Sequence, residues 1–421
     1  MNQLYPSKNF RGMHIPLLKG ICLILLICLL EFENAIAQST ISDFKNEPTL
    51  SWKFHSAQPF IASPMANGGT IYIGGLDSNL YALDASNGNI RWKFKTRGPI
   101  RSNVLIENDN LFLNGGDGNL YCLDKNSGKT NWVFKSKGEK HYDFADYFQS
   151  SPILYQQTIY FGSGDSNVYA ITEKEGKLIW RYKTSGVVHA TPAISDNKLF
   201  VGSFDGYFYA LNISDGSLIW KFKSVGERYF PKGEFQGSTV AAKGLVFAGN
   251  RDFNLYALDM NEGYCHWNTS FTGGWAMALT LSANDSILYI GTSDDRLLIA
   301  ADVFTGKEIW KTKVGFNIFG PCILSSSMCY AGTLLGKMYG LDLKTGTIQW
   351  TFTDDGYKKN HLNYFKEDDS YRDDIHSLIK SNDDYIKWMY DIGAIFSSPA
   401  ISNDIIVVSS TDGTIYGLKR K

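Results

Sequence analysis

Short runs of alternating hydrophobic and polar residues follow one another along most of this chain, separated by turns rich in Gly, Asp and Asn. Residues 191–223 show the pattern most clearly, with apolar-rich runs at 191–195, 199–203, 207–212 and 217–223. Alternation with a period of two predicts half-buried β-strands. The short turns between the runs predict that neighbouring strands pair antiparallel. This stretch is therefore predicted to form one four-stranded antiparallel meander.

The same unit recurs along the chain. The aromatic residues in its third strand are spaced by 40, 48, 40, 47, 43, 40 and finally 77 residues. A period in the 40s with several strands per unit is typical of a β-propeller, in which sheets stack radially and cover one another's faces. The third-strand segments lie at 80–84, 120–124, 168–172, 208–212, 255–259, 298–302, 338–342 and 415–419. We therefore predict an all-β fold, an eight-bladed propeller of four-stranded antiparallel blades.

The two ends of the repeat complement each other. The last copy stops after its third strand, and residues 50–54 form a fourth strand with no preceding partners. We expect the N-terminal strand to pair into the last blade and close the ring, since the blade would otherwise keep an open edge. Residues 38–421 are then one propeller. The long final spacing is expected to hold an insertion at 354–391 between the last two blades.

A Gly and then a Trp follow seven of the third strands, and an eighth Trp stands in the orphan strand. Segments such as ALDASNGNIRW (82–92) and GLDLKTGTIQW (340–350) resemble the tryptophan-docking motif of the pyrroloquinoline-quinone (PQQ) repeat family. The resemblance implies an eight-bladed propeller in which each Trp docks onto the adjoining blade. Such an indole buries a large area, and its N–H needs one polar partner. The expected docking residues are Trp52, Trp92, Trp132, Trp180, Trp220, Trp267, Trp310 and Trp350.

The repeat family includes cofactor-dependent enzymes and cofactor-free scaffolds, and the fold does not choose between them. Quinoprotein alcohol dehydrogenases typically carry adjacent cysteines over the quinone, and no two cysteines are adjacent here. No calcium-ligand set can be carried over residue by residue. We therefore expect a non-catalytic protein without a cofactor, most like the outer-membrane barrel-assembly propeller group. The alternatives are a dehydrogenase dependent on PQQ and Ca²⁺ and a module that binds a glycan or small ligand.

The N-terminus differs from the repeats. Lys19 precedes an apolar run at 21–30, and Ala35-Ile36-Ala37 follows. This arrangement is typical of a secretory signal peptide, expected here at 1–37 with cleavage near Ala37. An uncleaved anchor is the alternative. Export places the mature chain in the periplasm or cell envelope, or outside the cell, with no membrane span and with envelope proteins as partners. The formal net charge of −1 gives no electrostatic reason to expect nucleic acid binding.

Candidate functional residues lie in the long connections between the fourth strand of one blade and the first strand of the next. These are 137–148, 226–235 and 354–391, and connections of one type emerge on one face. Exposed aromatic and charged side chains are typical of interaction surfaces. The loops could instead pack together and plug the channel. The candidate interaction face comprises His141, Asp143, Asp146, Tyr147, His189, Glu227, Arg228, Tyr229 and Glu234.

Three features within or near these loops have structural interpretations. His189 starts a first strand, and we expect it to be a hydrogen-bonded polar residue lining the channel. The 354–391 insertion is expected to be a solvated loop with one short amphipathic helix around Ile375, Leu378 and Ile379. Cys322 and Cys329 could pair, although free buried thiols are favoured because cross-strand geometry is often poor for a disulfide. No cysteine–histidine spacing typical of a metal site is present.

Overall fold

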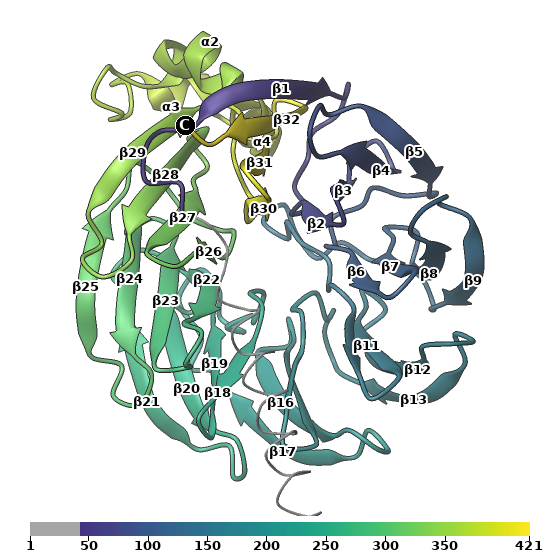
Figure 1. Cartoon of the computed structure of the whole chain (residues 1–421). Helices are drawn as coiled ribbons and strands as arrows, with labels where there is room; N and C mark the ends of the chain where they lie inside the picture. The colour runs from purple at the N-terminus through teal and green to yellow at the C-terminus, as the bar shows by residue number, and fades with distance from the viewer. Residues whose placement is uncertain (1–42) are drawn as a thin grey trace, which may run out of the picture. The chain divides into compact units, whose positions relative to one another are not determined.

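The computed structural model describes residues 43–421, and the predicted signal peptide at 1–37 lies outside the described residues. Within 43–421, eight four-stranded antiparallel sheets are arranged as the blades of a ring (Figure 1). In seven blades the shortest strand lies nearest the centre, and in the remaining blade all four strands have six residues. In every blade the fourth strand of the sheet forms the outer edge. The predicted fold, an eight-bladed propeller of antiparallel four-stranded blades, is confirmed.

The blades follow the order of the chain. The first four, from inner to outer strand, are β2 (Met65–Asn67), β3 (Thr70–Gly74), β4 (Asn79–Asp84) and β5 (Ile90–Lys95); β6 (Leu105–Glu107), β7 (Asn110–Asn114), β8 (Asn119–Asp124) and β9 (Thr130–Lys135); β10 (Ile153–Tyr155), β11 (Thr158–Gly162), β12 (Asn167–Thr172) and β13 (Leu178–Lys183); β14 (Ala193–Ser195), β15 (Lys198–Gly202), β16 (Tyr207–Asn212) and β17 (Leu218–Lys223). The remaining four are β18 (Val240–Ala242), β19 (Leu245–Gly249), β20 (Asn254–Asp259) and β21 (Cys265–Ser270); β22 (Ala276–Leu281), β23 (Ile287–Thr292), β24 (Leu297–Asp302) and β25 (Glu308–Lys313); β26 (Ile323–Leu324), β27 (Met328–Gly332), β28 (Lys337–Asp342) and β29 (Ile348–Thr353); β30 (Ala400–Ser402), β31 (Ile405–Ser409), β32 (Thr414–Lys419) and β1 (Thr49–His55).

Burial differs between the strands of a blade in a way that the sequence pattern explains. The second and third strands, such as β3 and β4, are buried almost throughout because neighbouring blades cover both faces. The outer strands, such as β5, alternate between exposed and half-buried residues. Exposed lysines on the outer strands, including Lys93 and Lys95, discourage the pairing of these edges with other chains.

Each repeat Trp joins one blade to the next. In seven of the eight, the indole Nε1 donates a hydrogen bond to a backbone carbonyl at the turn after the third strand of the following blade, and Trp350 donates instead to the carbonyl of Phe44, which precedes β1. The donor and acceptor pairs are Trp52–Ala85, Trp92–Lys125, Trp132–Glu173, Trp180–Ile213, Trp220–Met260, Trp267–Val303, Trp310–Leu343 and Trp350–Phe44, at distances from 2.6 to 3.2 Å.

The glycine of the repeat leaves room for the indole of the Trp from the preceding blade. Seven such glycines have positive φ, and a Cβ on any of them would lie 2.4–2.8 Å from the nearest indole carbon. The pairs are Gly88 with Trp52, Gly128 with Trp92, Gly176 with Trp132, Gly216 with Trp180, Gly263 with Trp220, Gly306 with Trp267 and Gly346 with Trp310. The Gly of one repeat therefore contacts the preceding blade, and the Trp of the same repeat contacts the following blade. One motif thus contributes to two interfaces between blades.

The N-terminal segment closes the ring, as predicted. β1 pairs antiparallel with β32 and supplies the outer strand of the last blade. The segment before β1 adds a second contact, because the carbonyl of Phe44 accepts the indole N–H of Trp350 at 2.6 Å. Phe44 is fully buried, and its backbone N–H donates to the Tyr330 hydroxyl at 2.7 Å. Residues 43–55 therefore provide both the missing strand and the missing turn of the eighth blade.

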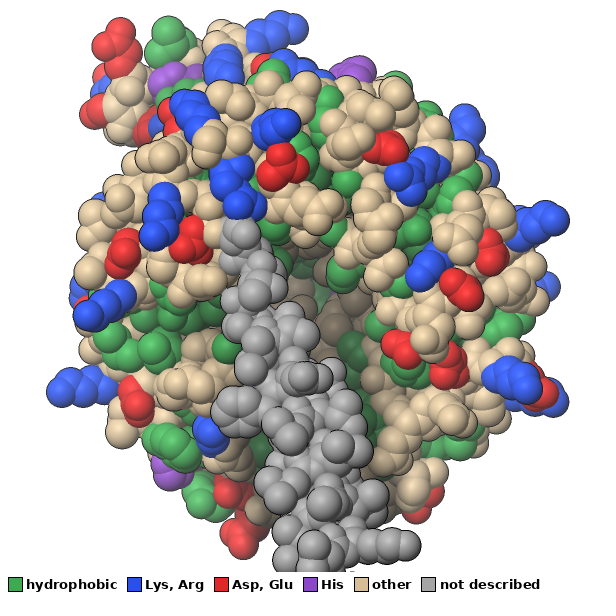
Figure 2. Space-filling view, in the orientation of Figure 1, with side chains coloured by type: hydrophobic (Ala, Val, Ile, Leu, Met, Phe, Trp, Pro, Cys, Tyr) green, Lys and Arg blue, Asp and Glu red, His purple; other side chains and the backbone are tan. Residues whose placement is uncertain are grey.

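The insertion between β29 and β30 is more ordered than the sequence indicates. It contains α2 (Asp355–Tyr364), α3 (Ile375–Leu378) and α4 (Asn382–Asp391). The expectation of a solvated loop with one short helix is wrong, since only α3 corresponds to that helix. On the face of residues 43–421 seen in Figure 2, Lys and Arg side chains are interspersed with Asp and Glu around the ring.

Candidate functional site

Three connections between blades meet at one face of the ring, as their shared topology predicts. The Tyr142 hydroxyl in the first connection donates to Glu234 Oε1 in the second at 3.0 Å. Gln236 Nε2 in the second donates to the Ala145 carbonyl in the first at 2.8 Å. The third connection, the helical insertion, brings Tyr385 of α4 to within 6.3 Å of Phe144, measured between ring centroids.

His189 holds the first connection in place through two of its carboxylates. Its Nδ1 lies 2.8 Å from Asp146 Oδ1, and its Nε2 lies 2.6 Å from Glu139 Oε1. Burial alone would lower the pKa of His189, but the two carboxylates raise it to about 10, so the imidazole is a cation at neutral pH. Burial opposes ionisation of Asp146 as well, yet His189 holds the pKa of that carboxyl below its usual value. The expectation that His189 is a hydrogen-bonded polar residue agrees with this contact.

Arg251 is a second anchor, which the sequence analysis missed. Its guanidinium is fully buried, donates to Asp143 at 2.6 and 3.2 Å, and donates to the Ala145 carbonyl at 2.9 Å. Its Nε and Nη2 also donate to Gln236 Oε1, at 2.9 and 2.7 Å. The guanidinium lies 4.9 to 5.5 Å from the ring centroids of Phe204, Phe230 and Trp275. A buried Arg needs all of these partners, because an unpaired charge would be costly to desolvate.

A sequence signal for Arg251 did exist. The turn between the second and third strands carries an Asp in most blades, and in six blades that Asp accepts the hydroxyl of a third-strand Tyr. The residue before that Asp varies from blade to blade, and it is Arg251 in one blade and Asp294 in the next. Alignment of the repeats at this single position would have singled out both residues.

The structure divides the nine candidate surface residues. His141, Arg228 and Tyr229 are exposed, and Asp143 and Glu227 are half-buried. Asp146, Tyr147, His189 and Glu234 are buried, so the expectation that they form a docking surface is wrong. We call the face where the three connections meet the mouth of the ring. The polar groups of these residues bind other residues of the mouth, while Tyr147 packs against Phe319 and Phe396. At these four positions the loops pack together, which was the alternative interpretation.

Apolar residues hold the helical insertion against the ring. In the sequence these residues are interspersed with charged ones, so their apolar pattern is hard to recognise. Trp388 and Met389 of α4 are each 1% exposed and join one cluster with Phe316, Phe365 and Ile392. α4 begins with a capping box in which Ser381 and Asp384 bind each other's backbone N–H groups. The acidic residues between the helices pair locally, for example Asp373 with Lys366 and Asp374 with Arg372.

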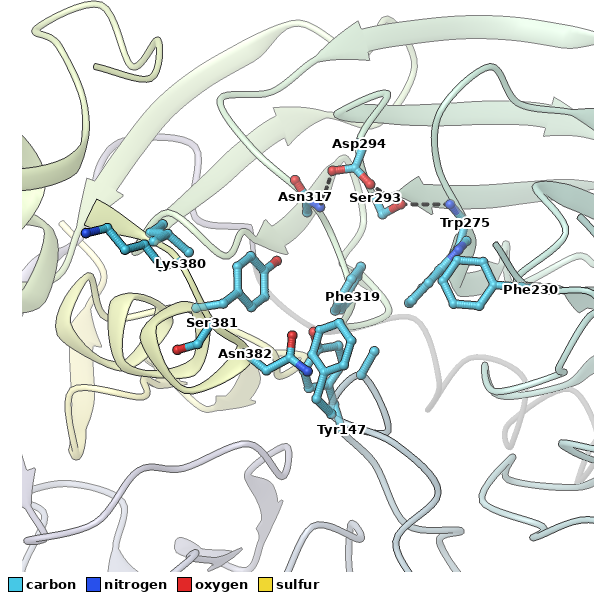
Figure 3. Close-up of a pocket in the computed structure, with 14 residues that line it drawn as sticks. Tyr147, Phe230, Trp275, Ser293, Asp294, Asn317, Phe319, Lys380, Ser381 and Asn382 are labelled. Carbon is cyan, nitrogen blue, oxygen red and sulfur yellow. Dashed lines mark hydrogen bonds between the residues drawn. The ribbon is translucent and has the colours of Figure 1, made fainter. Parts of the chain in front are cut away.

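A pocket of about 400 Å³ lies where the insertion meets the ring (Figure 3). That volume is within the range typical of ligand sites, about 300–1,000 Å³. Six of its lining side chains are aromatic: Phe144, Tyr147, Phe230, Trp275, Phe319 and Tyr385. Trp275 and Phe319 are nearly parallel, with ring centroids 6.1 Å apart. The pocket therefore offers broad apolar faces to a guest, with polar groups at its ends.

Comparisons with known proteins identify the family. The family model described as "Outer membrane protein assembly factor BamB" matches residues 37–171, 148–279 and 267–367. The chain belongs to this family. The BamB of Burkholderia pseudomallei is 22% identical over 120 residues, which cover 28% of this chain and 30% of that protein. Protein GAMETE EXPRESSED 3 of Arabidopsis thaliana is 24% identical over 112 residues, 26% of this chain and 17% of that protein. The match thus spans less than a third of either curated relative.

Solved structures share the fold across most of the chain. BamB from Moraxella catarrhalis has a TM-score of 0.63 and 15% identity, and the match covers 88% of this chain and 99% of that one. Quinohemoprotein alcohol dehydrogenase from Comamonas testosteroni has a TM-score of 0.66 and 12% identity, covering 90% of this chain and 78% of the enzyme. BamB and the dehydrogenase are therefore similar to this chain in fold to a comparable degree.

Most carboxylates at the mouth are paired with cationic side chains of the protein itself rather than grouped as ligands for a metal ion. A Ca²⁺ ion takes six to eight oxygen ligands, usually including several carboxylates. Three of the carboxylates here are already paired, Asp146 and Glu139 with His189 and Asp143 with Arg251. Within residues 43–421, no group of three or more His, Cys, Asp or Glu side chains is placed to hold a metal ion. The four cysteines of this part of the chain, Cys122, Cys265, Cys322 and Cys329, are free thiols.

One further finding concerns the membrane. In the 43–421 region, none of the helices is long and apolar enough to cross a bilayer.

Proposed function

We propose that this protein is a non-catalytic scaffold of the cell envelope that assists outer membrane protein assembly by binding a protein partner at the mouth of its ring. Membership of the BamB family supports the process. The single observation that supports the surface is the rim of the pocket. Phe144, which lines the pocket, is 45% exposed, and Tyr229, next to the lining residue Phe230, is 73% exposed. Exposed aromatics beside a pocket are typical of partner-binding surfaces.

The rigid ring gives this surface its value. A partner that binds a preorganised site avoids the entropy cost of ordering loops on association. Here the loops are already tied down by the buried His189 and Arg251 contacts. The scaffold would thus present Phe144 and Tyr229 in one fixed arrangement. Export to the periplasm, expected from the signal sequence, would bring this face to its partner.

Site-specific photocrosslinking in the source organism tests the proposal. A crosslinking amino acid in place of Tyr229 should capture components of outer membrane protein assembly. The same probe in place of Phe304 is the control, because Phe304 is comparably exposed at 50% but lies in the turn between β24 and β25, away from the pocket. Loss of the protein should also lower the amount of folded outer-membrane β-barrel proteins. Equal crosslinking from both positions would contradict the proposed surface, and alcohol oxidation with added PQQ and Ca²⁺ would contradict the non-catalytic role.

A further inference from the structure

One carboxylate of the aromatic pocket has no cation to neutralise it. Asp294 is exposed and is the one carboxylate among the described residues that line the pocket. Asn317 Nδ2 donates to its Oδ1 at 3.2 Å, and the Ser293 hydroxyl lies 3.4 Å from its Oδ2. No Lys, Arg or His within 43–421 forms an ion pair with it. Asp294 is thus oriented by neutral groups and has no cationic partner among the described residues.

The charge of Asp294 acts on the aromatic walls. Burial is the main cause that raises the pKa of the Tyr147 and Tyr385 hydroxyls, and the Asp294 carboxylate is one of several smaller contributions in the same direction. Both tyrosines therefore remain neutral, and the wall keeps its uncharged aromatic faces. A negative end and neutral aromatic walls attract a cation with an apolar stem.

The same face already contains a complete example of this chemistry. Arg251 places its guanidinium against Phe230 and Trp275, and its charge is paired with Asp143. Phe230 and Trp275 also line the pocket. The pocket thus repeats the parts of the Arg251 site, two shared aromatics and one carboxylate, with the guanidinium left out.

We propose that the pocket receives an arginine side chain of the protein partner, with its guanidinium paired to Asp294 and stacked on the aromatic wall. This inference rests on the proposed function, since it names the group with which the partner would enter. Arginine fits better than lysine because a planar, weakly hydrated guanidinium can stack on an aromatic face and bind a carboxylate through two hydrogen bonds. Lys380 lines the opposite side of the pocket with its amine pointing away from Asp294 (Figure 3).

Ligand-observed NMR with N-acetyl-arginine amide tests the inference on the whole protein. Saturation transfer should show saturable binding of this probe and much weaker binding of N-acetyl-citrulline amide, which has the same shape without the charge. Asp294→Asn should weaken binding of the arginine probe by roughly tenfold, the usual effect of losing a hydrogen bond to a charged group. Asp295→Asn is the matched control, because Asp295 binds Thr272 outside the pocket, and it should leave binding unchanged.

A third variant sharpens the electrostatic argument. Lys380→Met removes a positive charge from the pocket lining, so it should strengthen binding of the arginine probe by about twofold, in line with the small effect of exposed charges. Thermal melts of all three variants confirm that each is folded. Equal binding of the arginine and citrulline probes, or equal binding by wild type and Asp294→Asn, would overturn the inference.

Crosslinking separates this inference from the proposed function. If Tyr229 captures an assembly component equally well in wild type and Asp294→Asn, the scaffold role stands and the arginine contact is wrong. If the arginine probe binds through Asp294 but Tyr229 captures no protein, the proposed function fails and the pocket is a site for free cationic ligands. Loss of both probe binding and capture in Asp294→Asn, with both retained in Asp295→Asn, supports the whole proposal.

Discussion

The outer ring of tryptophans and the mouth of the ring are built on opposite principles. Around the ring, one contact recurs between blades, an indole against the glycine and carbonyl of the next turn. At the mouth, equivalent positions of the repeat carry different residues, Phe204, Arg251, Asp294 and Leu334 in successive blades. Each of these residues makes its own contacts. The repeated contact thus makes the ring rigid, and the positions that differ between blades determine the charged and aromatic groups at the mouth.

The strongest test of the ring is to open it. Deletion of residues 48–55 removes β1, leaves β32 unpaired on one side and removes Trp52 from its place against Gly88. We expect the melting temperature, followed by circular dichroism, to fall by at least about 10 °C, because several kcal/mol of packing are lost. Leu50→Ser is the control, since Leu50 is on the same strand but 50% exposed. An unchanged melting temperature in the deletion would refute closure by this strand.

His189→Gln tests the mouth with the next largest effect. Asp146 and Glu139 would lose their buried cation, and an unpaired buried charge costs about 3–5 kcal/mol of unfolding free energy. Chemical denaturation measures this loss. His266→Gln, at an exposed histidine, should change stability by less than about 0.5 kcal/mol.

The pH dependence of this effect has a definite sign. The pKa of His189 rises on folding from its ordinary 6.5 to about 10, so its contribution is complete below pH 6.5 and is lost as the pH rises toward 10. The pKa of Asp146 falls on folding, so its contribution is present above its ordinary 3.8 and is lost as the pH falls below that value. The stability difference between wild type and His189→Gln should therefore be greatest between these two ordinary values. A difference that grew from pH 7 to pH 10 would contradict the ion-pair assignment.

Gly346→Ala probes a single docking contact. The new Cβ would lie 2.4 Å from the Trp310 ring, on a backbone whose φ is +71°. Overpacking and left-handed strain together should lower the unfolding free energy by about 2–4 kcal/mol. Gly244→Ala separates the two causes, because Gly244 also has positive φ but nothing lies within 4 Å of its would-be Cβ. Equal losses in both variants would mean that the indole contact adds nothing.

The smallest expected effect concerns the thiols. Cys265 is exposed on an outer strand, whereas Cys122, Cys322 and Cys329 are buried in the blades. Under native conditions a thiol reagent should modify Cys265 alone among these four, and Cys265→Ser should change stability by less than about 0.5 kcal/mol. Mass spectrometry after labelling reads the sites. Native labelling of Cys322 or Cys329 would show that the seventh blade opens more easily than its packing indicates.

Most of the ring was predictable from sequence, and most of the mouth was not. The strand runs, the turns and the spacing of Trp52 to Trp350 predict eight blades, because each repeat carries its own period-two pattern. In contrast, Asp143 pairs with Arg251 across 108 positions of the chain, and no local pattern links them. The same is true of Tyr142 and Glu234. The exposed surface predicted there was partly wrong because such distant partners bury one another.

The chain order of residues therefore specifies the blades and their number, since neighbouring strands pair locally and identical units can only stack on one another. Which charges are neutralised, which aromatics remain exposed and where a pocket is left depend on loops from separate blades meeting at one face. Closing the ring brings those loops together. Only the folded molecule therefore shows that Arg251 is paired with a carboxylate, whereas Asp294 has no cation beside it.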